Sequence, residues 1–285
     1  MPSVAIVGCG WFGLPLAKSL VKDGYVVNGS KRDKRDAEAL MQHGINGFPL
    51  DLSLVQPELA NAHSALFNTD YLVINIPPAL RLGTSSYLAR IDQLLALISG
   101  RQFKRVIFIS TTGVYEADGK VDEHGTLATT ESAQTLLSAE TRILHFCSQG
   151  VANNGCIVRC AGLIGPKRHP GRFLAGKTDL SGGQNAVNLV HLDDCIAAVK
   201  ALITAEKVSQ IYNLCIPEHP TKAAFYRYAS VQLGLAPPQF TAPDVNDVDV
   251  PVNALADKIV DGNRICREVN FSYQYQTISD ALVAC

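Results

Sequence analysis

The sequence predicts an α/β protein built on a doubly wound parallel sheet, and three observations support this class. Strand-like and helix-like segments alternate through residues 1–160, which requires right-handed crossovers between parallel strands. The strands are nearly continuous apolar runs, which is typical of strands covered on both faces. The first run ends in a glycine-rich turn, and a helical pattern follows it at once.

The expected elements follow the hydrophobic pattern in chain order. Strands are expected near residues 3–8, 25–29, 46–49, 71–76, 105–110 and 155–160. Helices are expected near residues 12–23, 33–43, 84–99 and 131–149. A stretch rich in Gly, Pro, Lys, Arg and His covers 162–185, after which a strand at 188–191 and helical patterns near 193–205 and 220–234 follow. In such a fold, ligands bind beyond the carboxyl ends of the strands.

The composition excludes several classes of protein. The chain has 285 residues, 47% hydrophobic and 18% charged, which is enough for one large domain or one and a half. A formal net charge of −1 argues against nucleic acid or an anionic membrane as the main partner. No apolar run reaches the ~18 residues of a membrane span, and no signal peptide opens the chain, so we expect a cytoplasmic protein. None of the eight cysteines forms a C-x-x-C pair, so we expect reduced thiols and no metal site.

The most informative motif is the turn after the first strand, Gly8-x-Gly10-x-x-Gly13. Gly8 permits a tight turn, Gly10 lets a pyrophosphate approach the backbone because it has no Cβ, and Gly13 allows close packing of helix on strand. The helix N-terminus then offers free N–H groups and a partial positive charge to phosphates. The turn, with Trp11 and Phe12, is therefore a candidate dinucleotide site; the alternative is a glycine-rich turn without a ligand.

The end of the second expected strand indicates which dinucleotide would bind. NAD sites usually place Asp or Glu there to accept from the ribose 2′-hydroxyl, whereas this chain has Ser30, Lys31 and Arg32. Two cations and a hydroxyl suit a 2′-phosphate, which a carboxylate would repel. Asp33 lies just beyond and weakens the argument. NADP is therefore favoured over NAD, with a solvated basic turn as the alternative interpretation.

The fourth expected strand ends abruptly at Ile76-Pro77-Pro78, since proline cannot continue a ladder of backbone hydrogen bonds. We expect Ile76 and Pro77 beside the cofactor. The alternative is a plain strand end.

Further motifs occur along the whole chain. They are Asp51-Leu52, Ile109-Ser110-Thr111-Thr112-Gly113-Val114-Tyr115, the Arg159 to Pro166 segment, the Asn188 to Asp194 segment, Ile211-Tyr212-Asn213, and Lys258 with Asn263-Arg264. Together with the glycine turn, and in this order, they resemble the extended short-chain dehydrogenase/reductases, the family of nucleotide-sugar epimerases and dehydratases. The resemblance implies a dinucleotide-binding Rossmann domain at 1–164 plus about 188–215. It implies a smaller C-terminal substrate domain at 165–187 plus 216–285.

Two departures from the family pattern bear on activity. The first turn has the older dinucleotide spacing in place of Gly-x-x-Gly-x-x-Gly. The family's catalytic pair is Tyr-x-x-x-Lys with a Glu four residues later; Glu140 fits that Glu, which puts Ser132 and Leu136 at the Tyr and Lys positions. Ser132 cannot ionise near neutral pH, and Leu136 supplies no charge to lower a pKa. The chain therefore resembles an atypical branch that lacks the Tyr/Lys pair.

The resemblance also implies roles at the strand ends. Asp51-Leu52 lies where the family places an Asp-apolar pair near the adenine, and Ser110 belongs to the strand end that faces the cofactor. Thr111 and Thr112 are candidates for hydrogen bonds to the substrate or the nicotinamide ribose, with strand-end capping as the alternative. Tyr115 is the candidate to replace the missing acid, although no Lys is placed by spacing to lower its pKa.

A cationic loop occupies the position where the family's loop faces the substrate. Lys167, Arg168, His169 and Arg172 lie in it and suit a phosphate, pyrophosphate or carboxylate. The alternative is a solvated basic loop. His191 precedes a helix that opens with two Asp residues, and it is either a structural hydrogen-bonding group or an anchor of the substrate loop.

These expectations lead to one favoured function and two alternatives. The favoured function is an NADP-binding, epimerase/dehydratase-like oxidoreductase, monomeric or homodimeric, that acts on a small polar, anionic or sugar-nucleotide substrate. The second is a non-catalytic NADP(H) sensor on the same fold, which the missing Tyr/Lys pair favours. The third, a 6-phosphogluconate-type hydroxyacid dehydrogenase, ranks last because residues 188–194 and 211–213 do not resemble its all-helical second half.

Overall fold

The computed structural model describes residues 1–53, 64–78, 84–117, 119–152, 155–241 and 258–285. Its contacts divide the chain into two units, each assembled from three separate stretches. The first unit comprises Met1–Val114, Ala128–Arg159 and Ile196–Tyr212, and the second comprises Tyr115–Leu127, Cys160–Cys195 and Asn213–Cys285. The assignment of one unit to the cofactor and the other to a substrate stays a prediction.

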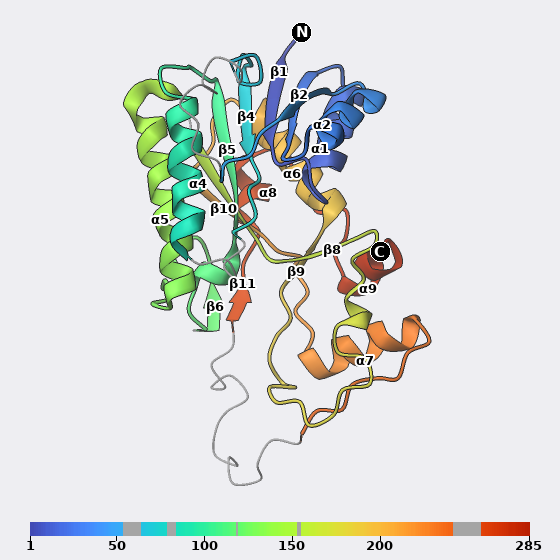
Figure 1. Ribbon diagram of the computed structural model, residues 1–285. Helices are drawn as coiled ribbons and strands as arrows, with labels where there is room; N and C mark the ends of the chain where they lie inside the picture. The colour runs from blue at the N-terminus through green and yellow to red at the C-terminus, as the bar shows by residue number, and fades with distance from the viewer. Residues whose placement is uncertain (54–63, 79–83, 118, 153–154, 242–257) are drawn as a thin grey trace. The chain divides into compact units, whose positions relative to one another are not determined.

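A seven-stranded parallel sheet forms the centre of the first unit, in the strand order β10-β7-β5-β4-β1-β2-β3 (Figure 1). The strands are β1 (Ser3–Val7), β2 (Val26–Lys31), β3 (Asn46–Pro49), β4 (Tyr71–Ile74), β5 (Arg105–Thr111), β7 (Gly155–Cys160) and β10 (Ile211–Leu214). β1 pairs with β2 on one side and with β4 on the other, so Ala5 lies opposite both Asn28 and Leu72. The chain runs outward from β1 to β3 and then returns to β4. The topological switch point, where ligands bind in such sheets, therefore lies between β1 and β4.

Helices cover both faces of this sheet (Figure 1). On one face, α1 (Gly13–Lys22) lies beside α6 (Leu192–Thr204), and Lys200 of α6 contacts Ser19 and Asp23 at distances of 3.1 and 2.6 Å. On the other face, α4 (Thr84–Leu97) packs against α5 (Glu131–Phe146). The shorter helical elements are α2 (Lys34–Glu38), the 3-10 helices η1 (Ala39–His43) and η3 (Thr112–Val114), and the π-helical turn η4 (Cys147–Val151).

The apolar runs of the sequence form the core of the sheet. Residues 4–6 of β1 and 72–74 of β4 have no exposed surface, as expected for strands with helices on both faces. Arg105 is also buried, at the start of β5, and donates to the carbonyls of Leu202 and Ala205. Leu202 lies in the last turn of α6 and Ala205 directly follows the helix. At this end a helix leaves its carbonyl acceptors unpaired and carries partial negative charge.

The second unit has two small parallel sheets and its own apolar core. β6 (Gly119–Val121) pairs with β11 (Lys258–Val260), and β8 (Gly162–Ile164) pairs with β9 (Leu189–His191). Its helical elements are the 3-10 helix η5 (Pro170–Arg172), α7 (Lys222–Gln232), α8 (Arg264–Glu268) and α9 (Ile278–Val283). Its core brings together side chains from β8, β9, α7 and α9, among them Ile164, Leu189, Phe225, Ile278 and Leu282.

The elements expected from the sequence are confirmed in kind and order, with differences at their ends. β2 runs on to Lys31 instead of ending at residue 29, because Ser30 and Lys31 still pair with β3. The helix expected at 33–43 is a short α2 followed by η1, and the helix expected at 131–149 changes to the π-helical turn η4 after Phe146.

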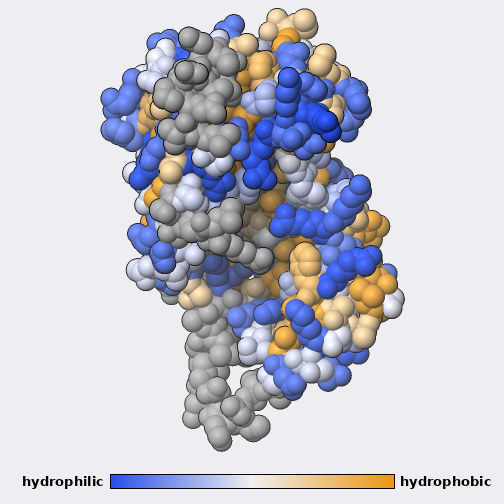
Figure 2. Space-filling view, viewed as in Figure 1, coloured by the Kyte–Doolittle hydropathy of each residue, from blue (hydrophilic) through white to orange (hydrophobic). Residues whose placement is uncertain are grey.

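The cysteines and the surface agree with the composition. All eight cysteines are free thiols and six of them are buried, which fits core packing. Of the helices that the structure describes, none has the length and apolar character needed to cross a membrane. Figure 2 shows a face that is largely hydrophilic, with hydrophobic patches on the second unit near α7 and α9. Exposed apolar side chains of that unit include Phe173, Tyr228, Val231 and Val283.

Candidate functional site

The glycine turn lies at the switch point, directly after β1. Gly8 has φ +99°, and a Cβ on it would lie 2.2 Å from the carbonyl oxygen of Asn75, which follows β4. Asn75 in turn donates its side-chain amide to the Gly8 carbonyl at 3.1 Å. The turn is thus fastened to the neighbouring strand, and only glycine fits at its first position.

The other two glycines differ in what surrounds them. A Cβ on Gly13, at the start of α1, would lie 2.2 Å from the carbonyl oxygen of Gly8, so this glycine allows the helix to pack on the turn. Among the residues that the structure describes, a Cβ on Gly10 would meet no atom within 4 Å. Neither backbone conformation nor internal packing therefore requires a glycine at position 10. Open space beside a glycine in this motif is what the approach of a pyrophosphate needs.

The N-terminus of α1 has the electrostatics that an anion requires. Its first turn contains no acidic residue, and the residue before it, Phe12, makes no side-chain cap. Within its first turn, the Leu14 N–H donates to Gly10 and Pro15 has no N–H, so the Gly13 N–H and the partial positive charge of the helix remain for an anion. Phe12 is buried, whereas Trp11 is half-buried beside the open Gly10 position.

The end of β2 places its polar residues in three different settings. Ser30 is 3% exposed, and its hydroxyl accepts from the Gly8 N–H at 3.1 Å, which leaves its own O–H free to donate. Lys31 is half-buried and Arg32 is exposed. Asp33 is the N-cap of α2 and accepts from the N–H groups of Arg35 and Asp36. The carboxylate that weakened the sequence argument for a 2′-phosphate is therefore engaged by its own helix.

Two more strand ends complete this edge of the sheet. Asp51, two residues beyond β3, accepts from the backbone and hydroxyl of Ser53 at 2.9 and 2.6 Å. These hydrogen bonds lower the pKa of the Asp51 carboxyl, and the charges of Arg32 and Arg90 lower it further. Leu52 and Ile76 are buried and Pro77 is exposed.

Ser110, near the end of β5, belongs to a buried polar network. Its hydroxyl donates to Glu140 on α5, and Glu140 also pairs with Arg159 of β7 at 2.6 Å. Glu140 and Arg159 are each 3% exposed, so their charges neutralise each other inside the unit. The lone pairs of the Ser110 oxygen still accept, so this residue suits a ligand that presents a donor.

The candidate catalytic residues are engaged within the protein. Thr111 accepts from the Gly113 N–H at 3.1 Å, and Thr112 is 6% exposed. Tyr115 is 2% exposed, and its hydroxyl donates to Asn213 at 2.9 Å. On α5, Ser132 is exposed and Leu136 is 7% exposed.

The cationic loop of the second unit is partly exposed. Lys167, Arg168 and Arg172 are exposed. His169 accepts from the Gly171 N–H through Nδ1 and so caps η5, and burial lowers its pKa. Three of the four predicted loop residues therefore face solvent.

His191 has no exposed surface. Its Nδ1 accepts from the Asp193 N–H at 3.1 Å, at the start of α6, and its ring meets Tyr275 edge-on at a centroid distance of 4.5 Å. Burial lowers the pKa of His191. This environment corresponds to the structural alternative, a capping group inside the second unit.

Sequence reasoning missed Asn75 and Arg90. The Asn75 side chain donates to the Gly8 carbonyl of the glycine turn, and the charge of Arg90 on α4 lowers the pKa of the Asp51 carboxyl. The signal that points to Asn75 is its position as a polar residue directly after a buried strand. Arg90 lies within a helical pattern and carries no such signal.

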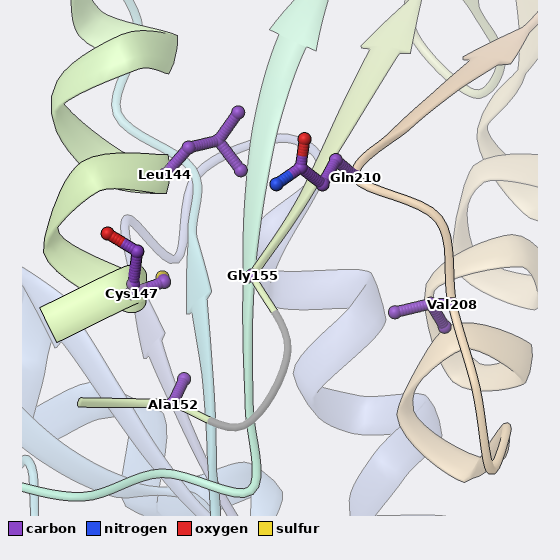
Figure 3. A pocket seen from close by; sticks show the side chains of 7 residues that line it. Leu144, Cys147, Ala152, Gly155, Val208 and Gln210 are labelled. Atoms are coloured by element: carbon purple, nitrogen blue, oxygen red, sulfur yellow. The ribbon is translucent and has the colours of Figure 1, made fainter. Parts of the chain in front are cut away.

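A small cavity of about 150 Å³ lies at the amino ends of the strands, opposite the carboxyl ends described above (Figure 3). Its walls are Leu144, Cys147, Ser148, Ala152, Gly155, Val208 and Gln210. Because β7 begins at Gly155 and β10 begins directly after Gln210, the cavity is at the amino ends of these strands. Figure 3 shows the Gln210 amide pointing toward Leu144. The cavity is smaller than the ~300–1,000 Å³ of ordinary ligand sites, and burial raises the pKa of the Cys147 thiol to about 11.

Solved structures of known proteins share this fold. The putative NAD-dependent epimerase/dehydratase of Methylobacillus flagellatus superposes with a TM-score of 0.74 at 21% identity over 99% of this chain and 96% of its own. The UDP-glucuronic acid 4-epimerase of Bacillus cereus, solved with NAD, gives 0.77 at 19% over 99% and 96%. The dTDP-glucose 4,6-dehydratase of Bacillus anthracis, solved with NAD, gives 0.77 at 14% over 100% and 95%.

The fold is therefore that of the NAD-dependent epimerases and dehydratases, the extended short-chain dehydrogenase/reductases, as the motifs predicted. No protein-family model matches the chain. The chain belongs to the family of the Escherichia coli protein YeeZ. It is 41% identical to YeeZ of strain K12 over 282 residues, which cover 96% of this chain and 97% of YeeZ, and equally similar to YeeZ of O157:H7.

Proposed function

We propose that the first unit binds a nicotinamide dinucleotide at the carboxyl ends of β1, β2 and β4. The observation that carries this proposal is the open space at Gly10, between two crowded glycines and at the N-terminus of a helix without acidic residues. A turn that used glycine for packing alone would crowd all three positions. The pyrophosphate would be held at the N-terminus of α1, by the Gly13 N–H and the partial positive charge of the helix.

The proposed cofactor is NADP in preference to NAD. Arg32 is exposed at the end of β2, Lys31 precedes it, and the Ser30 hydroxyl retains a free donor. Asp33 caps α2 and does not compete for the same cations. A 2′-phosphate would gain charge-assisted hydrogen bonds from such a group of donors.

The proposed activity is that of an epimerase/dehydratase-like oxidoreductase for a small polar, anionic substrate. A bound nicotinamide supplies hydride exchange at a carbon that bears oxygen. Exposed Lys167, Arg168 and Arg172 support an anionic substrate, since guanidinium and ammonium groups bind phosphate and carboxylate. The similar B. cereus epimerase has been solved with UDP-glucuronic acid, which is a substrate of this chemical kind.

A specific observation also favours the non-catalytic alternative. The hydroxyl of Tyr115, the candidate acid, is buried on Asn213, and Leu136 stands where the resemblance expects a Lys. A proton donor must reach the reacting group and have a pKa near the working pH. The second candidate is therefore an NADP(H)-sensing protein on the same fold.

The cofactor proposal is tested by titration of the wild type with NADPH and NADH. Trp11 is the single tryptophan of the chain and lies in the turn, so its emission reports binding directly. We expect NADPH to bind more tightly, and Arg32→Ala to narrow the difference by about 1–3 kcal/mol, the value of a charge-assisted contact. Arg35→Ala, an exposed arginine on α2, is the matched control and should leave the difference unchanged. Equal affinities in the wild type would refute the NADP assignment.

The activity proposal is tested by a screen of sugar nucleotides and hydroxy acids with bound NADPH or NADP. Once a substrate is found, Tyr115→Phe should lower kcat by roughly 10²–10⁴-fold if this residue is the acid, without changing NADPH affinity. Tight NADPH binding with no turnover of any compound would favour the sensor.

A further inference from the structure

The carbonyl oxygen of Gly8 lies beside the place proposed for the pyrophosphate. A Cβ on Gly13, the first residue of α1, would lie 2.2 Å from this oxygen. The oxygen therefore lies against the same residue whose N–H is left for an anion. A carbonyl oxygen carries partial negative charge, so a free lone pair at this place would repel a phosphate.

Two donors engage the Gly8 carbonyl. The N–H of Gly10 donates to it at 2.8 Å, and the side-chain amide of Asn75 donates to it at 3.1 Å. A carbonyl oxygen has two lone pairs, so both of them are used inside the protein. The Gly10 bond belongs to the tight turn itself, whereas the Asn75 bond comes from a residue 67 positions away in the chain.

Asn75 is held against the turn by its own backbone. Its N–H donates to the Val7 carbonyl at 2.9 Å, which continues the pairing of β4 with β1. Its backbone carbonyl oxygen lies 2.2 Å from the place of a Cβ on Gly8, and its Nδ2 lies 3.3 Å from the place of a Cβ on Gly13. Asn75 therefore contacts both crowded glycines, and the positive end of its amide dipole lies at the start of α1.

The two segments that meet here carry no charged side chain. Residues 8–17 and 72–78 include no Asp, Glu, Lys, Arg or His. Burial raises the pKa of the Cys9 thiol to about 12, so this group is neutral as well. In these segments the electrostatics at the start of α1 therefore depend on backbone dipoles and on the Asn75 amide.

We propose that Asn75 is a positioning residue for dinucleotide binding. Its amide occupies the second lone pair of the Gly8 carbonyl and so keeps the anion site at Gly13 free of an open acceptor. The inference rests on the proposed function and names a residue outside the glycine motif on which pyrophosphate affinity depends. Because NADP and NAD share the pyrophosphate, Asn75 should affect both equally, whereas Arg32 should affect NADP alone.

The test titrates the wild type, Asn75→Ala and Asn75→Asp with NADP and with NAD, followed by the emission of Trp11. Asn75→Ala removes the donor and should weaken both dinucleotides by the same factor, roughly 3- to 10-fold, the value of one hydrogen bond. Asn75→Asp also adds a carboxylate beside the pyrophosphate, so at pH 8 it should weaken both dinucleotides by on the order of 100-fold.

A comparison of pH 5 with pH 8 separates this role from a purely structural one. The negative charge of the ligand raises the pKa of the introduced carboxyl in the complex, and the protonated carboxyl can donate to the Gly8 carbonyl again. Relative to the wild type at the same pH, the loss in Asn75→Asp should therefore be about tenfold smaller at pH 5 than at pH 8. The loss in Asn75→Ala should be the same at both pH values, since alanine does not titrate. Thermal unfolding of each variant checks the fold.

Asn46→Asp is the matched control. Asn46 begins β3, at the amino edge of the sheet, and its side-chain amide donates to Asn28 at 2.9 Å. The same chemical change at this distant edge should leave the affinity for both dinucleotides unchanged at both pH values.

Three outcomes would overturn the role of Asn75 while the dinucleotide site stands. They are full affinity in a folded Asn75→Ala protein, a changed NADP-to-NAD ratio in either variant, and an equal loss at pH 5 and pH 8 in Asn75→Asp. If the wild type binds neither dinucleotide, the proposed function itself fails.

Discussion

At the scale of single residues, the glycine turn separates packing from ligand binding. A Cβ added to Gly8 or to Gly13 would lie 2.2 Å from a backbone carbonyl oxygen, whereas a Cβ added to Gly10 would meet no atom of the described residues within 4 Å. A glycine costs conformational entropy on folding, and at position 10 nothing within the described residues offsets that cost. The approach of a ligand gives a physical reason for glycine there.

This difference predicts opposite effects of the same substitution. Gly13→Ala should destabilise the fold by roughly 1–3 kcal/mol, because the new methyl group overlaps the Gly8 carbonyl. Gly10→Ala should stay within ~0.5 kcal/mol of the wild type, since the methyl group meets no atom and the unfolded chain loses freedom. Urea unfolding of both variants measures the two values. Equal losses would mean that position 10 is also needed for packing.

Some residue roles were visible in the sequence and others were not. The structural roles of Gly8 and Gly13 follow from the motif spacing. The cap at Asp33 could have been recognised, since an Asp before a charged helical segment is a typical start signal. The hydroxyls of Ser30 and Ser110 could not be assigned, because their partners Gly8 and Glu140 lie 22 and 30 residues away in the chain.

At the scale of elements, the apolar runs predicted, in order, the six strands of the central sheet that lie within the first 160 residues, but not the short strand β6. They did so because strands buried on both faces need apolar side chains at every position. The prediction failed at the polar end of β2, where backbone pairing of Ser30 and Lys31 with β3 extends the strand. It also failed at the carboxyl ends of two helices, where 3-10 and π turns replace the α-helix without a change in the hydrophobic pattern.

The packing of α5 on β7 depends on the buried pair of Glu140 and Arg159. Glu140→Gln should cost about 3–5 kcal/mol, because it leaves the Arg159 guanidinium buried without its counter-charge. The double variant Glu140→Gln with Arg159→Met should recover much of this loss. Chemical denaturation measures both, with Glu38→Gln as the control, since Glu38 and Lys34 form an exposed pair at 4.0 Å. A loss below ~1 kcal/mol in Glu140→Gln would show that the pair is dispensable.

The start of α6 predicts a dependence of stability on pH. Asp194 has no exposed surface, and its Oδ1 accepts from the Gln274 N–H at 2.7 Å. Burial raises the pKa of Asp194 from 3.8 to about 6. A carboxyl whose pKa is higher in the folded state stabilises the fold when protonated, so its contribution is present below about pH 4 and is lost as the pH rises through 6.

Asp194→Asn should remove this dependence while keeping the acceptor for Gln274. The variant should gain stability relative to the wild type between pH 4 and pH 7, by an amount on the order of 3 kcal/mol. Urea unfolding of both proteins at the two pH values gives the difference. A constant difference across this range would contradict the raised pKa.

At the scale of the whole molecule, fold and chemistry were predictable to different degrees. The order of motifs indicated the extended short-chain dehydrogenase fold, which similar solved structures confirm. The chemistry is harder to infer because the usual signal is missing: Ser132 and Leu136 stand at the expected Tyr and Lys positions. Burial of Tyr115 on Asn213 also depends on contacts between distant parts of the chain, which a motif does not reveal.

The proposed function depends first on the glycine turn, which we propose to hold the pyrophosphate of a dinucleotide. This site is tested by calorimetric titration of the wild type and of Gly10→Val with NADPH. We expect the wild type to bind, and Gly10→Val to keep its fold and thermal stability but to lose binding, because a branched side chain fills the space that the pyrophosphate needs. Unchanged NADPH affinity in a folded Gly10→Val protein would refute this site and place any dinucleotide elsewhere.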